Sequence, residues 1–152
     1  MKNFLSLSVF IIASLAIQPV EAQNYTSDDI LGTWLNEDED AHVLIYKEGG
    51  KYFGKISWLK NPVDEETGEA KKDKENPDES LQDRPLKGLV ILKDFEYDGG
   101  GEWDEGSIYD PKSGKTYSCY MELKEMDRLK IRGYIGVSLL GRTSYWTRVE
   151  EK

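Results

Sequence analysis

Short runs of alternating apolar and polar residues, separated by glycine-containing turns, make up most of this chain. In the run from Lys115 to Leu123 the apolar side chains recur at every second position, which places them on one face of a strand. Helical periodicity is hard to find after Gly32. The pattern predicts strands near Thr33–Asn36, His42–Lys47, Lys51–Leu59, Gly88–Glu96, Gly101–Tyr109, Lys115–Leu123, Arg128–Tyr134 and Gly141–Val149.

The connections between these strands indicate the fold class. Several are tight turns, such as Asp98–Gly101 and Asp110–Gly114, and a tight turn joins its two strands antiparallel. Consecutive antiparallel strands hide their edges best by closing into a barrel. We therefore predict an all-β fold, a single antiparallel meander barrel of about eight strands, preceded by a short helical turn capped by Ser27. A barrel of this size is filled by side chains or holds one small ligand.

The N-terminus predicts export. Lys2 precedes an uncharged apolar block, Phe4–Ile17. Val20 and Ala22 then place small residues at positions -3 and -1 of a signal cleavage site after Ala22. The block is shorter than the roughly 20 residues that span a bilayer. We expect residues 1–22 to be a signal peptide cleaved near Ala22. Residues 23–152 are then one barrel domain without a membrane span, located in the periplasm or secreted.

Charge and cysteine content exclude several classes of function. The chain has 20 basic and 29 acidic residues and a net charge of -9, whereas a nucleic-acid binder presents a basic face to phosphate. We therefore expect no nucleic-acid partner. A single cysteine, Cys119, excludes an intrachain disulfide, and with only one histidine it leaves no zinc cluster of the usual kind. No metal site and no cofactor is predicted.

The sequence predicts no catalytic residues. Nothing places a nucleophile beside His42, and Asp104 and Glu105, as neighbours on a strand, point to opposite faces unless a bulge intervenes. Gly114–Thr116 resembles the end of a phosphate-binding loop, but Tyr109 stands where that motif needs glycine. The sequence therefore favours a non-enzymatic protein.

One connection is long and acidic. The segment from Lys60 to Asp83 carries nine acids and almost no apolar side chains, so we expect it to lie in water. Within it, Asn61–Asp78 is predicted to be mobile and dispensable for folding. Leu81–Gly88 is predicted to be docked on the barrel, because it has apolar residues and the five-donor guanidinium of Arg84.

Aromatic side chains provide most of the candidate ligand site. All four tryptophans fall in predicted strands, where most are expected to fill the barrel. Tryptophan and tyrosine also carry a polar group that can orient a ligand. The candidate ligand-binding residues are Trp58, Arg84, Trp103, Tyr109 and Tyr117.

An ordered series of motifs runs along the chain: Gly32-x-Trp34, Gly54–Leu59, Asp73-x-x-Asn76-Pro77-Asp78 with Arg84-Pro85-Leu86-x-Gly88, Trp103-x-x-Gly106-x-Ile108–Pro111, Gly114-Lys115-x-Tyr117, Leu129-x-Ile131–Gly133 and Trp146-x-Arg148. This series resembles the DUF2147 family of small exported bacterial proteins of unknown function. The resemblance covers nearly the whole chain after position 22. It implies a lipocalin-like or streptavidin-like β-barrel and carries no catalytic assignment. Relatives often have cysteine where this chain has Tyr134, so no disulfide is expected there.

The opening Gly-x-Trp and a late arginine are also a device of lipocalin-like barrels, in which the arginine packs over the tryptophan and closes one end. The resemblance implies this closing role for Trp34, with either Arg148 or Arg132 above it. Stacking of arginine on tryptophan stabilises by roughly 0.5–2 kcal/mol.

Three functions remain open on these residues. The leading hypothesis is a barrel that binds a small, partly apolar or amphipathic molecule in its mouth. The alternative is an envelope-associated protein-interaction module whose partner the sequence does not identify, and an enzyme is third. An interior cavity of about 300 Å³ or more, lined by Trp58, Trp103 or Tyr117, favours the first function. A packed interior with an apolar surface patch favours the second.

Overall fold

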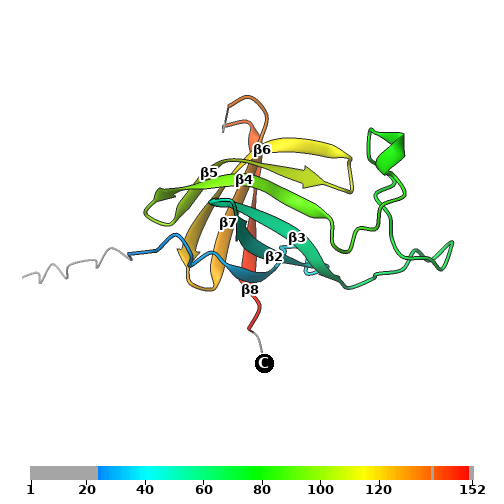
Figure 1. The fold of residues 1–152 in the computed structure, drawn as a ribbon, viewed down its shortest axis with the longest axis horizontal. Coiled ribbons are helices and arrows are strands. Elements are labelled where there is room, and N and C mark those ends of the chain that lie inside the picture. The colour runs from blue at the N-terminus through cyan, green and yellow to red at the C-terminus, as the bar shows by residue number, and fades with distance from the viewer. Residues whose placement is uncertain (1–23, 138, 151–152) are drawn as a thin grey trace, which may run out of the picture.

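The computed structural model describes residues 24–137 and 139–150, and these form a closed β-barrel (Figure 1). Each strand pairs antiparallel with the next in the chain, and the last strand pairs with the first. Residues 1–22, the predicted signal peptide, lie outside the described residues. The strands of the described chain are β1 (Gly32–Leu35), β2 (Ala41–Glu48), β3 (Lys51–Leu59), β4 (Val90–Gly99), β5 (Glu102–Asp110), β6 (Lys115–Glu125), β7 (Arg128–Tyr134) and β8 (Gly141–Arg148).

The predicted antiparallel meander barrel is confirmed. The alternation that predicted the strands also sets which side chains face inward: in β6, Cys119, Met121 and Leu123 are buried while their neighbours are not. Residues 27–30, where a helical turn was expected, form a turn in which the Leu31 N–H donates to the Asp28 carbonyl (3.1 Å). Among the described residues, no helix is long and apolar enough to cross a membrane.

One end of the barrel is densely packed with aromatic side chains. Trp34, Tyr52, Phe95 and Trp103 are all fully buried there, and the ring of Tyr52 meets that of Trp103 edge-on with centroids 6.2 Å apart. Gly106 makes room for this packing, because a Cβ at position 106 would lie 2.4 Å from the Phe95 ring. We call this the closed end.

Register shifts in β3 and in β5 change which way side chains point. In β3, His42 pairs with Trp58 but Val43 pairs with Ile56, so one extra residue turns Trp58 to the outer face, where its ring lies 4.4 Å from that of His42. In β5 the register shifts between Trp103 and Gly106, and both intervening acids are exposed.

The long connection between β3 and β4, residues 60–89, is named the strap. It leaves the end of β3 and returns to β4 past a short 3-10 helix, η1 (Glu79–Leu81) (Figure 1). Its tip carries the isolated bridge Val63–Ala70, and a second bridge joins Lys72 to Pro85. The expectation that the whole segment from Lys60 to Asp83 lies in water is wrong, because Asp73 is fully buried and Asn76 is 6% exposed.

The strap is packed against the β5–β6 turn. Gly114, at φ +68°, has no Cβ to collide with it, and a Cβ there would lie 1.8 Å from the Glu75 carbonyl oxygen. Leu86 packs against the hydrophobic core and its N–H donates to the Lys71 carbonyl (2.9 Å). Polar contacts of Asp73, Asn76 and Arg84, described below, hold the part of the strap between these residues.

Candidate functional site

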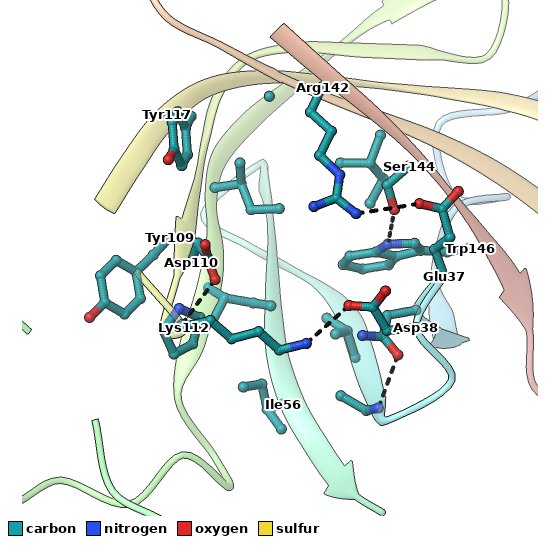
Figure 2. Close-up of a pocket in the computed structure, with 18 of the residues that line it drawn as sticks. Glu37, Asp38, Ile56, Tyr109, Asp110, Lys112, Tyr117, Arg142, Ser144 and Trp146 are labelled. Atoms are coloured by element: carbon teal, nitrogen blue, oxygen red, sulfur yellow. Dashed lines mark hydrogen bonds and ion pairs between the residues drawn. The ribbon is translucent and has the colours of Figure 1, made fainter. Parts of the chain in front are cut away.

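A cavity of about 660 Å³ opens at the end of the barrel opposite the closed end. Its walls come from the β1–β2, β5–β6 and β7–β8 connections, from the strap, and from the adjoining strand ends (Figure 2). The deeper lining is apolar and includes side chains that are nine-tenths or more buried, among them Val43, Ile56, Ile91, Ile131 and Trp146. The cavity is the size of pockets that hold drug-sized molecules, about 300–1,000 Å³.

Charged residues form the rim of this cavity. The ammonium of Lys112, from the β5–β6 turn, lies 3.0 Å from both Asp38 and Asp40 of the β1–β2 connection (Figure 2). Hydrogen bonds from Lys112 to these two carboxylates raise the pKa of the lysine above its usual value. Arg142, at the start of β8, approaches Glu37 at 3.9 Å. The rim therefore offers both donors and acceptors in water-accessible positions.

A buried polar network lies behind one wall of the cavity, where the strap covers β5. The Tyr109 hydroxyl donates to the Asp73 carboxylate (2.6 Å), and the amide of Asn76 donates to the same carboxylate (2.9 Å). Arg84 donates through Nε (2.9 Å) and forms an ion pair through Nη2 (2.7 Å) with Asp73. Buried charges require such pairing, because an unpaired carboxylate costs several kcal/mol. The network therefore docks the strap.

The network shifts the titration of its members. Burial alone raises the pKa of Asp73, but hydrogen bonds from Tyr109, Asn76 and Arg84 outweigh it and hold the pKa below its usual value. Burial and the hydrogen bond to Asp73 raise the pKa of the Tyr109 phenol. Asp73 is therefore a structural anion, and the hydroxyl of Tyr109 is committed to it.

The structure brings together some of the predicted ligand-binding residues and not others. Tyr109 and Tyr117 line the cavity. Arg84 lies behind its wall, with its guanidinium carbon 5.7 Å from the centre of the Tyr109 ring. Trp103 is in the closed end, and Trp58 is 41% exposed on the outer face, so neither lines the cavity.

The two arginines considered for closure are at opposite ends. Arg148 lies over Trp34, with its guanidinium carbon 4.2 Å from the ring centroid. Arg132 donates to the Thr143 hydroxyl (2.8 Å) and to the Leu139 carbonyl (3.3 Å), at the β7–β8 connection. Arg148 thus takes the position that the resemblance implied, and Arg132 supports a loop of the cavity mouth.

Several cavity residues were not singled out from the sequence. Strand alternation could have indicated Val43, Ile56 and Ile131 as inward-facing, but not that empty space remains beside them. Lys112 lies in a turn and Arg142 at the very start of β8, and neither belongs to a motif. The apolar composition of the β7–β8 connection was the one visible signal, since turns are ordinarily polar.

One carboxylate of the cavity lining and the single thiol of the chain have defined surroundings in the structure. Asp110 lines the cavity but accepts hydrogen bonds from Ser113 (2.7 Å) and from the Lys112 N–H (2.9 Å) within its own turn. Cys119 is buried, and burial raises the pKa of its thiol to about 12. Within the described ranges, no three or more of the residue types His, Cys, Asp and Glu are grouped to hold a metal ion.

A closed eight-stranded meander with an apolar cavity at one end defines the class of lipocalin-like β-barrels. The solved structure of protein HP1028 from Helicobacter pylori, a protein described as belonging to the lipocalin family, shares this fold. Its TM-score is 0.68 at 24% sequence identity, over 80% of this chain and 83% of that chain.

The chain belongs to the DUF2147 family, described as "Uncharacterized protein conserved in bacteria", whose model matches residues 32–148. That range begins with β1 and ends with β8, so the family corresponds to the barrel. No curated protein matches the sequence significantly.

Proposed function

We propose that this protein is an exported barrel that binds a small amphipathic molecule in the cavity opposite the closed end, with the apolar part of the molecule inside and its polar part at the rim. The observation that carries the proposal is the cavity of about 660 Å³ itself. Burial of apolar ligand surface against such a lining is favourable by roughly 25 cal/mol per Å² removed from water.

The distribution of polarity along the cavity supports an amphipathic ligand. The floor consists of branched aliphatic side chains and Trp146, whose indole N–H already donates to the Ser144 hydroxyl (3.0 Å). A polar ligand group has few partners at that depth, and desolvating it without a partner is unfavourable. At the rim, by contrast, Lys112, Arg142 and Asp110 face water and can contact a polar or charged group.

The exported location rests on the N-terminal sequence. The apolar block Phe4–Ile17 and the small residues before Gln23 have the order of a signal peptide. A single buried thiol, Cys119, is compatible with an oxidising compartment. The location is tested by determining the N-terminal residue of protein recovered from the cell envelope or the medium.

Ligand binding is tested by titration with the apolar fluorescent dye N-phenyl-1-naphthylamine. Wild-type protein is expected to give saturable fluorescence enhancement. Ile108→Trp places a larger side chain in the cavity and is expected to weaken dye binding at least tenfold, as a roughly 1.4 kcal/mol loss would. Native mass spectrometry of protein from its own cells tests for a retained natural ligand.

Ser107→Trp is the matched control, because neighbouring residues on β5 point to opposite faces of the barrel. This variant is expected to bind the dye as wild type does. Equal dye binding by both variants would place the dye elsewhere. No saturable binding, together with a ligand-free mass, would contradict the proposal and favour a protein-interaction module.

A further inference from the structure

The β7–β8 connection, residues 135–140, carries a concentration of exposed apolar side chains. Ile135 is 66% exposed, Val137 58%, Leu139 87% and Leu140 69%. Elsewhere in the described chain, the large apolar residues that are exposed lie singly on β3, the strap, the β6–β7 turn and β8. Apolar side chains gathered in this way mark a contact with another apolar phase.

The same loop belongs to the mouth of the cavity. Ile135 and Leu140 line the cavity as well as being exposed, so they join the cavity interior to the outside of the barrel. In Figure 1 the connection between β7 and β8 projects from the barrel. A molecule leaving the cavity past these side chains therefore meets the apolar loop before it meets bulk water.

The backbone of the loop is suited to an apolar environment. The Ile135 N–H donates to the Leu140 carbonyl (3.1 Å), the Leu140 N–H donates to the Val137 carbonyl (3.0 Å), and Arg132 donates to the Leu139 carbonyl (3.3 Å). Polar backbone groups that enter hydrocarbon must be paired inside the protein. These bonds pair several of the loop's backbone groups within the protein.

Size and charge decide between a lipid surface and a protein partner. Four side chains on one projecting loop fall well short of the roughly 800 Å² that each partner buries in a stable protein interface. The charged residues lining the cavity are nearly balanced, with Glu37, Asp38, Asp40 and Asp110 against Lys71, Lys112 and Arg142, although the whole chain has a net charge of -9. The cavity mouth can therefore approach a zwitterionic surface without strong repulsion.

We infer that the apolar loop 135–140 inserts into the surface of a zwitterionic lipid bilayer and places the cavity mouth against the lipid. The cavity then exchanges its ligand directly with the lipid phase; this second step rests on the function proposed above. Binding by insertion depends on apolar contact, so it is insensitive to salt.

The test is flotation with phosphatidylcholine vesicles. The protein is purified from exporting cells and checked by mass for removal of residues 1–22, because that apolar block would itself bind lipid. Wild type is expected to float with the vesicles equally at about 50 and about 500 mM NaCl. Leu139→Asp is expected to lower the partition coefficient at least tenfold, since a charge replaces an inserted apolar side chain.

Met126→Asp is the matched control. Met126 is 49% exposed in the β6–β7 turn, next to the closed end, and this variant is expected to float as wild type does. All three proteins are also titrated with N-phenyl-1-naphthylamine. If wild type binds the dye but does not float, the inference of lipid insertion is overturned and the proposed cavity function stands. If wild type floats but does not bind the dye, lipid insertion stands and the proposed cavity function is contradicted.

Two further outcomes would also overturn the inference. Binding restricted to anionic vesicles and abolished by salt would make the contact electrostatic. A concentration-dependent dimer, seen by sedimentation and abolished by Leu139→Asp, would make a second copy of the chain the occupant of the loop.

Discussion

Arg148 lies directly opposite Trp34 in the β1–β8 seam that closes the barrel, with its guanidinium carbon 4.2 Å from the centre of the indole ring. The same guanidinium donates to the carbonyls of Leu31 (2.8 Å), Asp29 (2.5 Å) and Met126 (2.5 Å). It therefore ties the N-terminal turn and the β6–β7 turn to the last strand. One side chain caps the closed end and leaves the opposite end available for the cavity.

Removing this pair is expected to destabilise the barrel. Trp34→Ala deletes a fully buried indole and should cost about 3–5 kcal/mol. Because Arg148 stacks on that ring, Trp34→Ala and Arg148→Ala should be non-additive by about 0.5–3 kcal/mol. Urea denaturation of the two single variants and the double variant measures both quantities. A loss below about 1 kcal/mol for Trp34→Ala would contradict the closing role of this residue.

The buried carboxylate of Asp73 predicts a pH dependence of stability. Because the pKa of Asp73 is lower in the folded than in the unfolded chain, its charged form stabilises the fold above about pH 3.9. This contribution is lost as the pH falls through the folded pKa. Asp73→Asn should therefore cost about 2–4 kcal/mol at pH 7 and progressively less below about pH 4, as measured by urea denaturation across pH.

Asp83→Asn is the control for that measurement. The Asp83 side chain is 93% exposed and lies 3.4 Å from the ammonium of Lys72, so its removal should cost less than about 1 kcal/mol. If the two variants lose stability equally, or if the cost of Asp73→Asn does not change with pH, Asp73 is not the anion on which the docking of the strap depends.

The alternation of apolar residues predicted the strands because it reflects the pleat itself, and β6 shows it residue by residue. It failed at Trp58, because one extra residue in a β-bulge reverses every later side chain and leaves no mark in the sequence. The burial of Asp73 had no local signal either. It depends on Arg84, eleven residues away, and on Tyr109 in another strand. Charge pairing across the fold therefore overrode the polar composition of the strap.

From the sequence, the cavity was one of two alternatives for the interior of an eight-stranded barrel, which is either filled by side chains or holds a small ligand. The sequence indicates that Ile56 and Ile131 face inward, but the volume left between inward-facing side chains depends on the diameter and shear of the barrel. The residues at the rim, such as Lys112, come from turns that share no periodicity. The proximity of Lys112 to Asp38 follows from the antiparallel meander and its closure, which bring the β5–β6 turn and the β1–β2 connection to the same end of the barrel.

The thiol of Cys119 is expected to be unreactive in the folded protein. Burial raises its pKa to about 12, and the thiolate is the form that alkylates. At about pH 8 iodoacetamide should therefore label the protein in denaturing urea and leave it unlabelled in native buffer. The result is measured by intact mass. Labelling of native protein at the rate seen in urea would show that the β6 core opens readily.

The close approach of the strap to Gly114 gives a test of strap docking by backbone geometry. Gly114→Ala adds a Cβ at φ +68° that would lie 1.8 Å from the Glu75 carbonyl oxygen, so the strap must move. Gly49→Ala is the matched control, because Gly49 has φ +57° and nothing within 4 Å of an added Cβ. In both variants the free energy of unfolding should fall by about 1 kcal/mol, because alanine is strained in the left-handed region. In Gly114→Ala it should fall by about 1–2 kcal/mol more, because the strap is displaced.

Limited proteolysis completes this comparison. Displacing the strap in Gly114→Ala should increase cleavage between Glu65 and Lys74, whereas Gly49→Ala should be cleaved as wild type is, since its turn lies between β2 and β3. Deleting the exposed tip, residues 65–68, should change stability by less than about 1 kcal/mol, because loop-closure entropy varies slowly with length. Equal stability and equal cleavage of the two alanine variants would show that the strap is not held against the β5–β6 turn. The polar network around Asp73 would then be too weak to dock it.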